Sequence, residues 1–182
     1  MDETGPGDQK EWVLAVLQEY ERPLLRFAWR LTDDEDSARE IVQHVFLRLC
    51  GQSHEALGDR IAPWLFSVCR NLSVDILRKR SVASEESDFE LADYPGKEPN
   101  PADSAEKADT HRHINRMVDE LPLPQREAVA LWAEGFAYRE IADVTKNTEG
   151  NVRVIVHRAL KRLREHPFVV GQVSNLSDKR SK

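Results

Sequence analysis

The sequence predicts an all-α fold of two small helical domains joined by a flexible acidic linker. Apolar residues recur at helical spacing on both sides of residues 82–109, and no segment shows the alternation typical of strands. Residues 82–109 contain several prolines and few apolar residues, which favours an extended linker. We therefore expect domains at 8–81 and 110–167, the linker between them, and a polar tail at 168–182.

Three apolar stripes predict the helices of the first domain. The first stripe covers residues 10–31, with a bend expected at Pro23. Ser37 is predicted to cap the second helix, with Glu40 reaching back to complete a capping box. A polar loop over 51–60 follows, and then a third helix.

The third helix of this domain is expected to carry Pro63 in its first turn, where proline is well tolerated. Cys50 and Cys69 fall within the apolar patterns of the second and third helices. Neither belongs to a metal-binding spacing, so both are predicted to be small buried thiols of a chain in a reducing compartment.

The second domain reads as short helices ending in a longer one. Thr148 is the predicted N-cap of the last helix, after a break at Thr145-Lys146-Asn147. A short helix, a tight turn and a longer helix have the spacing of a helix-turn-helix. The expected helices cover 111–120, 122–132, 138–144 and 148–164.

Composition excludes several classes of protein. The 182 residues are 40% hydrophobic and 32% charged, and no uncharged run approaches the roughly 20 apolar residues of a membrane span. The acidic start lacks a secretion signal, which predicts a cytoplasmic protein. No phosphate-binding glycine loop, zinc-protease motif or nucleophile elbow is present, so we expect no catalytic residues, no metal and no cofactor.

Charge is distributed unevenly. The chain carries a net charge of −6, but residues 82–109 alone carry −7, which leaves +1 for the rest. The acidic total is therefore a poor guide to binding, and local patches must be considered separately.

The last helix has an apolar back and a basic front. Val152, Val156, Ala159 and Leu163 form the stripe expected to pack on the domain. The opposite face suits a phosphate-lined groove, although a solvated basic helix end is the plainer interpretation of such a pattern. Its polar residues are Glu149, Asn151, Arg153, His157, Arg158, Lys161, Arg162 and Arg164.

The third helix of the first domain shows a weaker form of the same pattern. Basic residues lie around its apolar stripe, with aromatic residues at its start, a combination that suits single-stranded nucleic acid as well as an ordinary core with a solvated rim. The residues are Trp64, Phe66, Arg70, Asn71, Arg78, Lys79 and Arg80.

These segments, in this order, resemble the extracytoplasmic-function (ECF) subfamily of the sigma-70 family of bacterial RNA polymerase sigma factors. PLLRFAWRLTDDEDSAREIVQHVFLRLC and APWLFSVCRNLSVDILRKR are similar to sigma region 2. LPLPQREAVALWAEGFAYREIADVTKNTEGNVRVIVHRALKRLRE is similar to region 4. The turn departs from the family, which commonly has Leu-Gly-Ile where Thr145-Lys146-Asn147 stands, and Ala137 replaces a common capping Ser or Thr.

The resemblance implies a non-catalytic initiation factor whose partners are core RNA polymerase, promoter DNA and an anti-sigma factor. Residues implied to read the −35 element are Tyr138, Arg139, Thr148, Glu149, Asn151, Arg153, His157, Arg158, Lys161 and Arg162. Those implied at the −10 element are Asp59, Arg60, Trp64, Arg70, Asn71, Arg78, Lys79 and Arg80. Glu40, Gln43, Phe46 and Arg48 are implied to contact the polymerase.

Two alternatives remain open at the level of sequence. A helix-turn-helix regulator would bind duplex DNA directly, with a steep salt dependence and without polymerase. A purely protein-binding module would keep its basic faces solvated, and loss of Arg153 and Arg158 would leave nucleic-acid binding unchanged.

Overall fold

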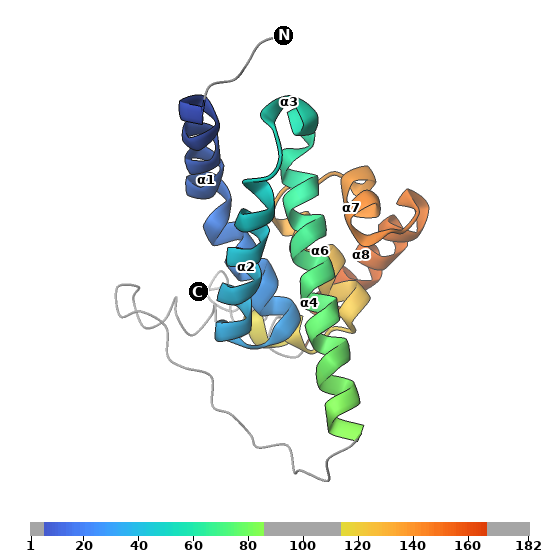
Figure 1. Ribbon diagram of the computed structural model, residues 1–182. Coiled ribbons are helices and arrows are strands. Elements are labelled where there is room, and N and C mark those ends of the chain that lie inside the picture. Colours follow the sequence, from blue (N-terminus) through green and yellow to red (C-terminus); the bar gives the residue numbers. More distant parts are fainter. Residues whose placement is uncertain (1–5, 86–113, 167–182) are drawn as a thin grey trace, which may run out of the picture.

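A computed structural model describes residues 6–85 and 114–166, and within these ranges the regular structure is entirely helical (Figure 1). The all-α prediction is therefore confirmed. Most of the predicted linker and the tail at 168–182 lie outside the described residues. The helix before the predicted linker continues to Glu85, past the boundary expected at 82.

The first domain is built around three long helices, α1 (Pro6–Thr32), α2 (Glu35–Leu49) and α4 (Ile61–Glu85). α1 continues through Pro23, which removes one backbone donor without ending the helix. Apolar side chains from all three helices meet in one core, in which Leu24, Phe27 and Leu65 are almost completely buried.

The start of α2 differs from the predicted capping box. Asp34 is the N-cap, and its carboxylate accepts a hydrogen bond of 3.1 Å from the backbone N–H of Ser37. Ser37 therefore lies inside the helix rather than at its cap. An Asp three residues earlier offers the same acceptor together with a negative charge, which the positive end of a helix favours.

The predicted loop over 51–60 contains short helices. Ser53 caps α3 (His54–Leu57), and the 3-10 helix η1 (Gly58–Arg60) leads into α4. The segment HEAL follows a Ser cap and contains good helix formers, and both features favour a short helix. Its polar character alone indicates a loop. Gly58 has φ 47°, a value that glycine adopts at little cost and that allows the change of direction.

The second domain follows the predicted order closely. A helical segment over 114–119 precedes α6 (Leu123–Ala133), α7 (Tyr138–Thr145) and α8 (Glu149–Arg164). Gly135, with φ 93°, turns the chain out of α6. α4 lies between α1 and α2 on one side and α7 and α8 on the other, so the two domains share apolar contacts (Figure 1).

Candidate nucleic-acid interface

The helix-turn-helix is formed by α7 and α8. Ile141, Ala142 and Val144 of α7 are buried, as are Val152 and Val156 of α8, so the two helices pack through their apolar faces. Thr148 caps α8 as predicted, accepting a 3.3 Å hydrogen bond from the N–H of Asn151. The result fixes one face of α8 on the domain and leaves the other in solvent.

The turn between these helices bends through Lys146. This residue has φ 55° and ψ 47°, the left-handed conformation that glycine adopts most readily. Its N–H and that of Asn147 both donate to the carbonyl of Ala142, which satisfies the end of α7. The turn thus forms without its usual glycine, at the cost of placing a side chain in a strained region.

The start of α7 keeps half of a capping box. Ala137 has no side-chain acceptor, but its backbone N–H donates to Glu140 Oε2 over 2.8 Å. The donor that a Ser or Thr hydroxyl would satisfy has no such partner here.

The exposed face of α8 carries the predicted basic residues. Arg153, His157 and Arg158 are all exposed, whereas Ala159 on the opposite side is fully buried. This arrangement confirms the predicted apolar back, with Leu163 half-buried at its end. The other exposed residues of the predicted −35 set are Arg139, Thr148, Glu149, Asn151, Lys161 and Arg162.

Arg153 is held in place by two neighbours. Its Nη2 lies 2.6 Å from Glu149 Oε1, and its Cζ lies 4.9 Å from the centroid of the half-buried Tyr138 ring. An ion pair one turn away and a cation–π contact both restrict the guanidinium. Tyr138 therefore serves in the free chain as a support for the central cation of the face.

The residues predicted for the −10 element occupy different environments. Asp59 and Arg60 are exposed on η1, and Arg78 and Lys79 are exposed near the end of α4. Trp64, Arg70 and Asn71 are partly buried within α4.

Arg70 and Arg80 are engaged by other parts of the chain. Arg70 Nη2 lies 3.1 Å from Glu127 Oε2 of α6. Arg80 donates to the carbonyl of Thr32, to Asp34 and to Ser37 over 2.8–3.0 Å, which joins the end of α4 to the α1–α2 turn. Hydrogen bonds from Ser37 and Arg80 lower the pKa of Asp34, the Ser37 contact contributing most.

The residues of α2 predicted to contact polymerase differ in their exposure to solvent. Glu40, Gln43 and Arg48 are exposed on one side of the helix, whereas Phe46 is only 8% exposed and packs in the core. Cys50, at the end of α2, is exposed, so the prediction that it is buried was wrong. Cys69 is buried, and burial raises the pKa of its thiol to about 12.

Two apolar residues that the sequence analysis missed lie on these surfaces. Leu47 is 61% exposed on α2 and Val154 is 44% exposed on α8. Both residues fall outside the buried apolar stripe of their helix, and this position in the pattern could have predicted their exposure. An exposed valine on a basic helix face can contact the methyl group of thymine in a major groove.

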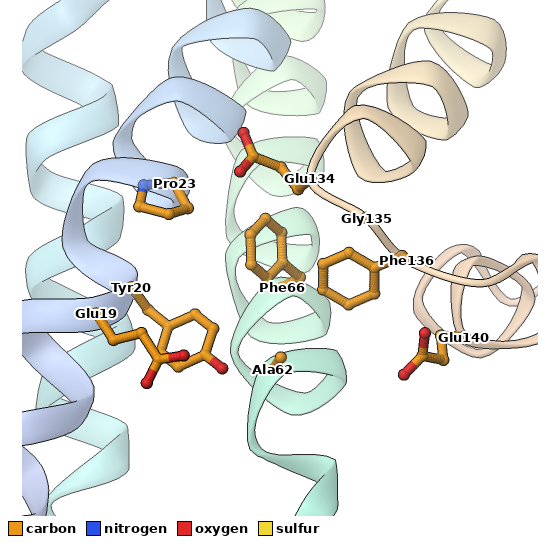
Figure 2. A pocket seen from close by; sticks show the side chains of 9 residues that line it. All are labelled: Glu19, Tyr20, Pro23, Ala62, Phe66, Glu134, Gly135, Phe136 and Glu140. Atoms are coloured by element: carbon orange, nitrogen blue, oxygen red, sulfur yellow. The ribbon is translucent and has the colours of Figure 1, made fainter.

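An open pocket of about 340 Å³ lies where α1, α4 and the α6–α7 connection meet (Figure 2). Phe66 and Phe136 stand edge to face within it, with ring centroids 4.8 Å apart. Glu19 and Glu140 lie at its margins. Within the described residues, no cluster of three or more metal-ligating side chains occurs.

The fold and these surfaces define a helical DNA-binding protein of the helix-turn-helix class with a second helical domain. The family model of sigma-70 region 2 matches residues 16–82, and that of sigma-70 region 4 matches residues 111–163. The chain belongs to the sigma-70 family, and its relatives identify it as a member of the ECF subfamily of RNA polymerase sigma factors.

Similar proteins span most of the chain. The ECF RNA polymerase sigma factor EcfG of Rhodopseudomonas palustris is 32% identical over 82% of this chain and 82% of its own length. SigX of Bacillus subtilis is 25% identical over 81% and 79%. The sigma factor RpoE of Bartonella quintana, solved in complex with the anti-sigma factor NepR, has a TM-score of 0.69 and 28% identity, covering 87% of this chain and 95% of that one. No helix within the described ranges has the length and apolarity needed to cross a membrane.

Proposed function

We propose that this sigma factor reads the −35 element through the exposed face of α8 and holds an opened strand of the −10 element against α4 and η1. The observation that carries the proposal is the α8 face itself. Arg153, His157 and Arg158 are exposed over a fully packed back, on a helix whose N-terminus is capped and free to enter a major groove.

Base edges and phosphates would be divided along α8. Residues in its first two turns, Asn151, Arg153 and Val154, would reach base edges. Lys161 and Arg162, nearer its end, suit contacts with phosphate oxygens. The Glu149 carboxylate and the Tyr138 ring would restrict Arg153 before DNA arrives.

The proposed polymerase contact lies on α2. Glu40, Gln43 and Arg48 surround the exposed Leu47, so the surface combines an apolar centre with a polar rim. Phe46, which is buried, supports this surface from below. The protein itself would catalyse no step and would act in the cytoplasm, and an anti-sigma factor is the expected regulator of its access to polymerase.

Run-off transcription tests this proposal. Core bacterial RNA polymerase is assayed with and without the full chain on a library of promoter fragments. We expect transcripts from a subset of promoters only when the chain is present. The absence of any chain-dependent transcript would refute the proposal, and tight binding to duplex DNA without polymerase would favour a regulator of the helix-turn-helix class instead.

Two double variants test whether the exposed face of α8 binds promoter DNA. Arg153→Ala with Arg158→Ala should lower promoter-dependent transcription at least about tenfold, since each lost contact to a base or phosphate costs roughly 1 kcal/mol or more. Lys10→Ala with Arg22→Ala removes the same charge from exposed positions on α1. This control should keep wild-type activity, and an equal loss in both double variants would contradict the assignment.

A further inference from the structure

One face of α4 is covered by the second domain. Phe66 and Arg70 lie one helical turn apart, so their side chains share a face. Phe66 is 1% exposed, and its ring meets that of Phe136 at an interplanar angle of 66° (Figure 2). The Arg70 side chain is 19% exposed and pairs with Glu127, whose side chain is 4% exposed.

An aromatic ring and a guanidinium one turn apart match the two halves of a nucleotide. Bases of a separated strand stack on aromatic side chains, and arginine binds phosphate oxygens. The groups that cover this face resemble the base and the phosphate of a nucleotide, since Phe136 supplies a flat ring and Glu127 supplies a pair of anionic oxygens.

We propose that Phe136 and Glu127 occupy, in the free chain, the place on α4 that a nucleotide of the opened promoter strand takes in the initiation complex. The C-terminal domain thereby imitates the ligand of the N-terminal domain. This inference rests on the proposed function, because it assumes that α4 binds an opened strand.

The covering contact is imperfect, which permits exchange. Arg70 Nε and Glu127 Oε1 are both buried without a hydrogen-bond partner in the described parts of the chain. Burial also raises the pKa of Glu127, an effect that Arg70 only partly offsets. A buried ion pair with unsatisfied atoms contributes little to stability, and a phosphate in an open, hydrated site can replace the carboxylate.

Apolar side chains of both domains also meet in one buried core across this junction, and its other polar contacts are exposed or single hydrogen bonds. Arg26 holds Glu134 through a bidentate pair, but the Arg26 side chain is 53% exposed, so water and salt screen the attraction. Arg126 donates to the carbonyl of Arg30 over 3.1 Å. Removing the aromatic contact of Phe136 and the ionic contact of Glu127 should therefore uncover this face of α4 and weaken the junction, which the shared apolar core also holds.

Energy transfer between two dyes measures the opening. Cys50 is exposed and accepts one dye, Asp143→Cys on the exposed side of α7 accepts the other, and Cys69 is buried. We expect high transfer in the free wild-type background. The double variant Glu127→Gln with Phe136→Ala should lower the transfer, and so should core polymerase added to the wild-type background. If the double variant folds poorly, Phe136→Ala alone should lower the transfer. Unchanged transfer in folded variants would overturn the proposal.

Binding of a fluorescent 20-nucleotide oligo-dT strand to the free chain measures the uncovered site. The double variant should bind at least about tenfold more tightly than the wild type, and adding Arg70→Ala should remove that gain. Asp36→Asn removes one exposed carboxylate on α2 and should leave the affinity unchanged. Equal affinity of wild type and double variant would overturn the proposal.

The run-off assay separates the two proposals. Promoter-dependent transcripts combined with unchanged dye transfer and oligonucleotide affinity would refute the covered site and leave the sigma function standing. Opening of the junction and tighter oligonucleotide binding without any transcript would refute the sigma function, while the covered strand-binding face would stand.

Discussion

Replacing Lys146 by glycine should stabilise the helix-turn-helix. Lys146 has φ 55°, a conformation that costs a residue with a Cβ atom about 1–2 kcal/mol. Glycine removes that strain but loses about 0.5–1 kcal/mol through the greater freedom of the unfolded chain. The net gain lies between about 0 and 1.5 kcal/mol, and its midpoint of about 0.75 kcal/mol corresponds to a rise in Tm of about 2–3 °C for a protein of this size.

Thermal unfolding followed by circular dichroism at 222 nm measures this gain, with Lys146→Ala as the matched control. Alanine removes the same charge but keeps the Cβ atom, so its Tm should stay at or below that of the wild type. A Tm of Lys146→Gly no higher than that of Lys146→Ala would refute the reasoning, because the strain assigned to the turn would then be absent.

Three further changes test local features. Asp34→Asn keeps a capping side chain but removes the charge. Because the folded pKa of Asp34 is below its unfolded value, the wild type should be the more stable near pH 6 in urea unfolding. The difference should shrink as pH falls below about 4 and vanish below the folded pKa. Alkylation at pH 8 should modify Cys50 in the native chain and Cys69 only after denaturation, as mass spectrometry of the labelled chain will show. Val156→Ala should cost about 2 kcal/mol in urea unfolding through the cavity it leaves, whereas Arg158→Ala, on the opposite face, should change stability by less than about 0.5 kcal/mol.

Helical periodicity predicted the elements well where one face of a helix is buried. The stripe of Val152, Val156 and Ala159 predicts from the sequence alone which side of α8 is buried, and so which side is exposed. The cap of α2 was misplaced because Asp34 and Ser37 both suit an N-cap, and the choice depends on backbone geometry.

The contacts between the domains could not be predicted from local patterns. Arg70 and Glu127 are 57 positions apart, and neither position indicates a partner without knowledge of how the domains pack. Phe136 lies in a short connection and carries no periodic signal. Pairings of this kind depend on tertiary packing, which helical spacing does not specify.

Arg80 has a consequence for how the initiation complex is assembled. By bonding to the Thr32 carbonyl, Asp34 and Ser37, it ties the far end of α4 to the first turn of α2. Under the proposed docking of polymerase on α2, these contacts would couple the position of α2 to that of the end of α4. Seating the first helix would set the angle at which the second meets the DNA, so a single docking event would align both.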